Sequence, residues 1–157
     1  MSAVAVRPAR AADLDAVRAL FVQYAQSLDF KLCFTGFDAE LASLPGEYAP
    51  PSGRLLVAER KGAVIGCAGV RAVDGGCELR RLYVTPSARG TGAGRRLVEA
   101  ALSGAREAGH ARIELETIGE TMKAAQALYA RLGFTGPDPA ALPGTVLRYV
   151  RALEGGS

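Results

Sequence analysis

Apolar and polar residues alternate in some segments of the chain, whereas in others the apolar residues recur every three or four positions. Alternation is typical of a half-buried strand, and a spacing near 3.6 residues is typical of an amphipathic helix. The two patterns predict the order strand, helix, three strands, helix, strand, helix, strand. The predicted strands cover residues 4–8, 54–60, 63–73, 77–85, 111–117 and 145–152, and the predicted helices cover 14–28, 92–108 and 121–132.

This order of elements predicts an α/β or α+β layer fold with a mixed sheet. The length of 157 residues suits one domain. We expect that domain to span 1–153 and the tail 154–157 to be frayed. The long segment 29–53 is rich in glycine and proline, and a short helix over 38–43 is compatible with it. Ordered loops of this length are often functional, so we expect this one to shape a ligand site.

Composition narrows the function classes only slightly. The formal charge of +3 suits a small anionic ligand as well as a nucleic acid. We expect neither a membrane-spanning helix nor a secretory signal, because the chain has no apolar run near 18 residues and no basic start. The cysteines Cys33, Cys67 and Cys77 are widely spaced, and His110 is the only histidine. A zinc site is therefore not expected, and reduced cysteines favour a cytoplasmic protein.

A glycine-rich turn lies between a predicted strand and a predicted helix. Residues 89–94 read Arg-Gly-Thr-Gly-Ala-Gly. Glycines let the backbone approach a ligand, and the free N–H groups at a helix start bind phosphate oxygens. Arg89, Arg95 and Arg96 add positive charge. A plain tight connection would also use glycines, so the turn alone indicates a phosphate site only weakly.

Two other phosphate-binding motifs do not fit this turn. A P-loop requires Gly-Lys-Ser/Thr at the helix start, which is absent here. A dinucleotide fingerprint that begins at Gly90 requires a third glycine where the chain has Arg95. The turn therefore belongs to neither class.

The motif Arg89-x-x-Gly92-x-Gly94 resembles the Gln/Arg-x-x-Gly-x-Gly/Ala signature of the GNAT N-acetyltransferase superfamily. The preceding 81–84, Arg-Leu-Tyr-Val, is similar to a central strand of that family, and 128–134 is similar to its Leu-Tyr-x-x-Leu-Gly-Phe motif. The resemblance extends over nearly the whole chain. It implies a central twisted mixed sheet of about six to seven strands flanked by about four helices.

The resemblance implies that the chain binds acetyl-CoA as co-substrate and uses no metal. The pantetheine arm would enter where strand 113–117 splays from strand 77–85. Many family members carry asparagine where this chain has Met122. The implied coenzyme A contacts are Leu82, Tyr83, Val84, Arg89, Gly90, Thr91, Gly92, Ala93, Gly94, Arg95, Thr117 and Ala125.

The implied reaction is direct transfer of an acetyl group to a primary amine. An alkyl ammonium, with a pKa near 10, must first lose a proton, and the leaving thiolate benefits from an acid. Glu78 is the candidate base, directly or through water, and an ion pair with Arg80, Arg112 or another basic residue is the alternative. Tyr129 is the candidate acid, and a core tyrosine is the alternative.

The sequence does not identify the amine that accepts the acetyl group. Phe34, Glu47, Tyr48 and Glu116 are candidates for the acceptor site, although packing explains the aromatic residues almost as well. A small-molecule amine and a peptide or protein amine both remain open, and a homodimer is a family-level expectation. A non-catalytic acyl-CoA sensor is the alternative function. A nucleic-acid-binding protein is disfavoured, because no strand face combines aromatic and basic residues.

Overall fold

The computed structural model describes residues 3–27, 37–118, 123–135 and 146–153. The strands are β1 (Ala5–Pro8), β2 (Arg54–Arg60), β3 (Ala63–Val73), β4 (Gly76–Val84), β5 (Arg112–Ile118) and β6 (Val146–Ala152). The α-helices are α1 (Leu14–Ser27), α2 (Phe37–Ser43), α3 (Ala93–Glu107) and α4 (Lys123–Arg131). Three short 3₁₀ turns, η1 (Ala11–Asp13), η2 (Gly46–Tyr48) and η3 (Pro86–Ala88), lie between them. No helix in the described ranges is long and apolar enough to cross a bilayer.

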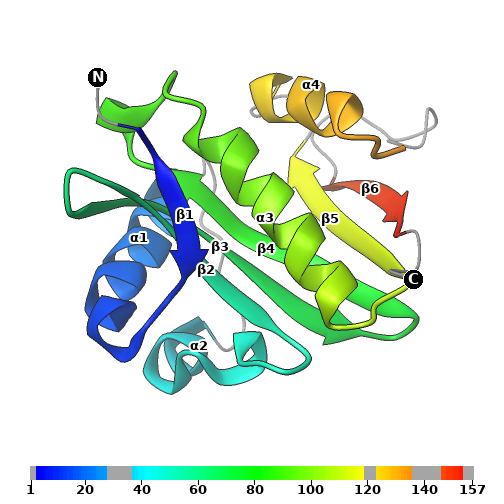
Figure 1. The fold of residues 1–157 in the computed structure, drawn as a ribbon, viewed down its shortest axis with the longest axis horizontal. Coiled ribbons are helices and arrows are strands. Elements are labelled where there is room, and N and C mark those ends of the chain that lie inside the picture. The colour runs from blue at the N-terminus through cyan, green and yellow to red at the C-terminus, as the bar shows by residue number, and fades with distance from the viewer. Residues whose placement is uncertain (1–2, 28–36, 119–122, 136–145, 154–157) are drawn as a thin grey trace.

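The six strands form one mixed sheet in the order β1-β2-β3-β4-β5-β6. Neighbouring strands run antiparallel except β4 and β5, which are parallel and are connected through α3. In Figure 1 these two strands lie together near one end of the sheet and diverge toward the other. The mixed sheet and the order of elements confirm the sequence prediction, and the predicted ends of most elements differ from the observed ones by one or two residues.

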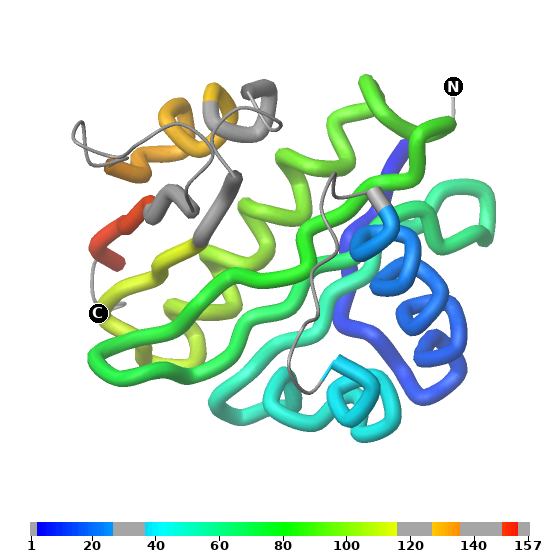
Figure 2. Tube along the Cα trace, turned by 180° about the vertical axis from the view of Figure 1, so that it is seen from behind, coloured from blue at the N-terminus to red at the C-terminus, as the bar shows by residue number. Residues whose placement is uncertain are grey.

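Helices cover both faces of the sheet, and each face has its own apolar core. Helix α3 packs on one face, and α1 and α2 pack on the other, as Figures 1 and 2 show from opposite sides. The core under α3 includes Leu97, Val98 and Ile113, and Tyr129 of α4 belongs to it. The core under α1 is built around Phe21 and Tyr48. Many residues of the central strands are therefore buried on both faces of the sheet.

Candidate active site

The strands β4 and β5 pair over only a short distance. The paired positions are Cys77 with Ile113 and Glu78 with Glu114. Beyond Glu78 the two strands separate, so the rest of β4 has no partner strand on that side within the described part of the chain. Backbone groups that lack a ladder partner can bind an extended ligand. The splay that the sequence resemblance implied is therefore present.

A bulge in β4 lies next to this splay. Cys67 faces Tyr83 and Gly69 faces Arg80, so a single residue of β3 lies opposite both Arg81 and Leu82. Arg81 has a φ of 59°, which is unusual for a residue with a side chain. Since the extra residue interrupts the alternation, the consecutive side chains of Arg80 and Arg81 both contact α2.

The glycine-rich turn leads directly into α3. Gly90 and Gly92 have φ of 84° and 86°, and Gly92 is the N-cap residue of the helix. No side chain of the described residues caps this end. The first helical hydrogen bond runs from Arg96 N to Gly92 O at 3.1 Å, so the N–H groups of residues 93–95 have no acceptor within the helix. A Cβ added at either glycine would meet no described atom within 4 Å.

Positive charge surrounds the same turn. The guanidinium of Arg89 lies 5.9 Å from the ring centre of Tyr83, and its Nε donates to Val84 O at 3.4 Å. Arg95 is exposed and pairs with Glu99 at 2.9 Å. Open space, free N–H groups and arginines at one helix start fit the diphosphate of coenzyme A.

The structure thus brings together most of the predicted coenzyme A residues. Positions 82–84 lie on β4 beside the splay, and positions 89–95 form the turn and the start of α3. Thr117 lies on β5 and Ala125 on α4, but their side chains are outside the described part of the structure, as is the side chain of Glu116. Phe34 and Met122 lie wholly outside the described residues.

Tyr129, the candidate acid, lies on α4 with only 3% of its surface exposed. Its ring packs at 5.8 Å from that of Phe134 and 5.7 Å from that of Tyr149. Burial raises the pKa of Tyr129, and the nearby phenols of Tyr24 and Tyr149 raise it further. The ring therefore has a packing role, and its hydroxyl keeps its proton at neutral pH.

Glu78, the candidate base, lies at the base of the splay and is buried. Its Oε1 accepts a hydrogen bond from Arg71 Nε at 2.8 Å and lies 3.6 Å from Arg80 Nε. The ion pair that the sequence left as an alternative is therefore present. Arg112 is not its partner, since that guanidinium lies 3.5 Å from Glu114 instead.

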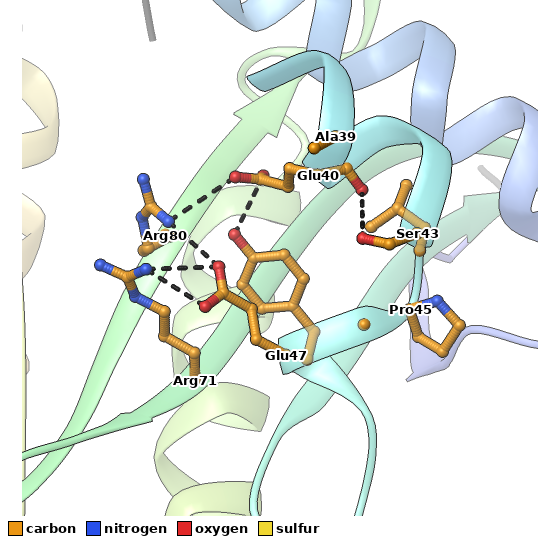
Figure 3. A pocket seen from close by; sticks show the side chains of 10 residues that line it. Ala39, Glu40, Ser43, Pro45, Glu47, Arg71 and Arg80 are labelled. Atoms are coloured by element: carbon orange, nitrogen blue, oxygen red, sulfur yellow. Dashed lines mark hydrogen bonds and ion pairs between the residues drawn. The ribbon is translucent and has the colours of Figure 1, made fainter. Parts of the chain in front are cut away.

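A cavity of about 580 Å³ lies between η2, α2 and the strands β3 and β4 (Figure 3). Glu47 and Tyr48, two predicted acceptor-site residues, line it. Tyr48 is fully buried, and its ring lies against Gly69, so it also supports the packing interpretation. Its hydroxyl donates to Glu40 Oε2 at 3.0 Å, and burial raises its pKa. Glu47 is more exposed and faces Arg71 and Arg80.

The sequence reasoning missed Glu40 as a residue of this site. Its carboxylate accepts two hydrogen bonds from Arg81, each 3.0 Å long. Burial would raise the pKa of Glu40, but the hydrogen bonds and charge of Arg81 outweigh it and lower that pKa. No local sequence pattern marks Glu40; the pair Arg80-Arg81, which breaks the apolar alternation of β4, indicates only the bulge.

The described cysteines do not form a reactive site. Burial raises the pKa of Cys67 strongly, and burial together with the charge of Glu114 raises the pKa of Cys77 to about 12. Cys77 is packed in the core under α3, and Cys67 is packed in the core under α1. Within the described ranges, no three His, Cys, Asp or Glu residues gather as they would around a metal ion.

Comparison with known proteins agrees with this geometry. The profile described as the acetyltransferase (GNAT) family matches residues 17–134. An uncharacterised N-acetyltransferase of Schizosaccharomyces pombe is 35% identical over 130 residues, which cover 81% of this chain and 79% of that protein.

Solved structures share the fold over almost the whole chain. An acetyltransferase of the GNAT family from Staphylococcus aureus has a TM-score of 0.78 at 18% identity, covering 97% of this chain and 100% of that one. A Salmonella typhimurium acetyltransferase solved with acetyl-CoA has a TM-score of 0.73 at 24% identity, covering 97% and 95%. At these identities the likeness concerns the fold.

Proposed function

The chain belongs to the acetyltransferase (GNAT) family, and on that premise we propose that it transfers an acetyl group from acetyl-CoA to a primary amine. The family consists of acyltransferases that use acetyl-CoA, so the enzyme class follows from membership. The proposal adds a direct attack of the amine on the thioester, without a covalent enzyme intermediate. One observation carries the proposed acetyl transfer from acetyl-CoA: the chain leads from the splayed part of β4 through the glycine-rich turn into the uncapped start of α3.

The coenzyme would be held mainly by the backbone. The N–H groups of residues 93–95 would bind the diphosphate, and Arg89 and Arg95 would add charge to that site. Backbone groups of residues 82–84 would bind the pantetheine arm along the open side of β4. The thioester supplies the activated acyl group. In this arrangement the acyl carbon would lie within the splay.

Proton removal from the amine is assigned to Glu78, acting through a water molecule. The carboxylate lies at the base of the splay, and the close ion pair with Arg71 at 2.8 Å fixes its orientation. A positioned base of this kind contributes about 10²- to 10⁴-fold to a rate. The same ion pairs would also serve a purely structural carboxylate, and the kinetics of Glu78→Gln distinguish the two roles.

Tyr129 is assigned as the proton donor to the leaving thiolate. A phenol with an ordinary pKa near 10 is protonated at neutral pH, as a donor requires, and burial raises the pKa of Tyr129 further. A backbone N–H beside the bulge at Arg81 would bind the developing oxyanion, because the bulge reorients groups of β4. The described residues therefore supply a candidate for each of the three roles that the reaction needs.

The acceptor would be a small-molecule amine or the amine of a peptide or protein. It would bind in the cavity that Glu47 and Tyr48 line. We also propose a cytoplasmic location, on the basis of cysteines suited to a reducing compartment.

The test is release of free thiol from acetyl-CoA across a panel of amino acids, polyamines, drug amines and peptides. Amine-dependent release that falls in Glu78→Gln and in Tyr129→Phe supports the proposal. Tight binding of coenzyme A without turnover on any amine contradicts it and favours a non-catalytic acyl-CoA sensor.

A further inference from the structure

Arg80 contacts three different carboxylates, but none of them closely. Its guanidinium lies 3.4 Å from Glu47, 3.6 Å from Glu78 and 3.7 Å from Glu40. Charge-assisted hydrogen bonds of arginine to a carboxylate are usually near 2.7–2.9 Å and often bidentate. Within the described part of the structure, Arg80 makes no such bond.

The neighbouring arginines, in contrast, each form short hydrogen bonds to a carboxylate. Arg81 donates two 3.0 Å hydrogen bonds to Glu40, and Arg71 donates a 2.8 Å hydrogen bond to Glu78. Glu40 and Glu78 are thus already engaged by other cations. Arg80 keeps donor capacity toward a further anion, while only 22% of its side chain is exposed.

Glu47 is the most weakly held carboxylate of the group. Its oxygens lie 3.2 and 3.3 Å from Arg71 and 3.4 Å from Arg80. Its side chain is 45% exposed and comes from the short turn η2. Figure 3 shows it pointing across the cavity toward both guanidinium groups. A carboxylate that entered the cavity could replace it there at little cost.

We infer that Arg80, assisted by Arg71, binds a carboxylate of the acceptor in place of Glu47. The acceptor would then be an amine that also carries a carboxylate, as amino acids do. This inference rests on the proposed transfer to an amine. Arg80 directly precedes the bulge and lies two residues before Leu82, so the proposed carboxylate site and the proposed pantetheine site lie on the same stretch of β4.

A polyamine fits this cavity less well. Its ammonium groups would need free carboxylates, but Glu40 is occupied by Arg81 and by the Tyr48 hydroxyl, and Glu78 is occupied by Arg71. Glu47 is held more weakly, but it already lies beside the guanidinium groups of Arg71 and Arg80. A second cation would also face Arg80 and Arg71 across a half-buried space, where like charges repel. The charges thus favour an anionic group over a second amine.

The experiment compares amino acids with their amides, in which a neutral group replaces the carboxylate. Glycine and glycinamide form one pair, and β-alanine and β-alaninamide form another. The kcat/KM of wild type should be at least about tenfold higher for the acid, because charge-assisted hydrogen bonds are the strong ones. Arg80→Gln should reduce this ratio to within about twofold. An acid-to-amide ratio near one in the wild type, or a ratio that Arg80→Gln leaves unchanged, overturns the inference.

Two further variants separate this role from a defect in folding. Glu47→Gln removes the competing carboxylate, so KM for the acid should fall several-fold while KM for the amide stays constant. Arg60→Gln makes the same chemical change as Arg80→Gln at the far end of β2 and should leave the ratio as in wild type. A Glu47→Gln variant with a higher KM for the acid contradicts the replacement of Glu47.

The outcomes also separate this inference from the proposed function. Equal turnover of acids and amides overturns the carboxylate site and leaves acetyl transfer intact. If no amine is turned over, the proposed function fails. The carboxylate site is then tested by binding alone, with calorimetric titration of the same acid and amide pairs into the protein in the presence of coenzyme A. Acid-selective binding that Arg80→Gln abolishes supports the site, and equal or absent binding overturns it.

Discussion

The guanidinium of Arg81 and the carboxylate of Glu40 meet through two hydrogen bonds of 3.0 Å. The pair ties the bulge of β4 to helix α2 across 41 positions of sequence. Only 5% of the Arg81 side chain and 12% of the Glu40 side chain are exposed. Because Arg81 also adopts a left-handed φ, the contact helps to hold a backbone geometry that would otherwise be unfavourable.

Glu40→Gln should therefore destabilise the fold. The change removes the close anion beside a buried guanidinium, and we expect the free energy of unfolding to fall by about 2 kcal/mol. Urea denaturation measures it. Glu99→Gln, which breaks an exposed pair with Arg95, should change stability by less than about 0.5 kcal/mol. Equal effects of the two changes would contradict a structural role for the Arg81–Glu40 pair.

Asp13 should make stability depend on acid pH. Hydrogen bonds from the Arg7 side chain and from the Arg10 backbone lower the pKa of Asp13 to about 2. A lowered pKa in the folded state stabilises the protein above the unfolded value near 4, and this stabilisation is lost as the pH falls toward 2.

The Asp13→Asn variant tests this dependence. It should be less stable than wild type by about 1–2 kcal/mol at pH 7, and the difference should shrink between about pH 4 and pH 2. Asp15→Asn is a matched control, since Asp15 is fully exposed and should have little effect. A stability difference for Asp13→Asn that stays constant from pH 7 to pH 2 would argue against the assigned pKa.

Tyr129→Phe should impair turnover far more than folding. The aromatic packing with Phe134 and Tyr149 remains, so the free energy of unfolding should change by less than about 1 kcal/mol. Loss of the acid should lower kcat by about 100-fold with little change in KM for acetyl-CoA. Steady-state kinetics at saturating acceptor measure this. An unchanged kcat would leave Tyr129 as a core tyrosine only.

The fold was predictable from the sequence because its strands and helices follow simple periods. β2 and β3 begin and end where the pattern of 54–60 and 63–73 predicted. The local geometry of the proposed coenzyme site was also predictable, because its turn and its strand are adjacent in sequence. A local motif suffices when the chemistry depends on backbone groups within one short stretch.

The acceptor side was much less predictable. Glu40, Arg71 and Arg80 come from three separate elements, and their contacts depend on how α2 packs against the sheet. Periodicity does not specify such packing. The bulge at Arg81 adds to the difficulty, because it places on one face two residues that a regular strand would separate.

The central claim is that the start of α3 binds the diphosphate of coenzyme A, and calorimetric titration of a glycine variant tests it most directly. Gly92 and Gly62 both have positive φ, of 86° and 80°, with no described atom within 4 Å of an added Cβ. Gly92→Val and Gly62→Val thus strain the backbone alike, but only the first places a side chain in the proposed diphosphate site.

The account predicts that wild type and Gly62→Val bind coenzyme A with similar affinity, whereas Gly92→Val weakens binding at least about 30-fold, or about 2 kcal/mol. Absence of coenzyme A binding by the wild type, or equal affinity in all three proteins, would contradict the claim.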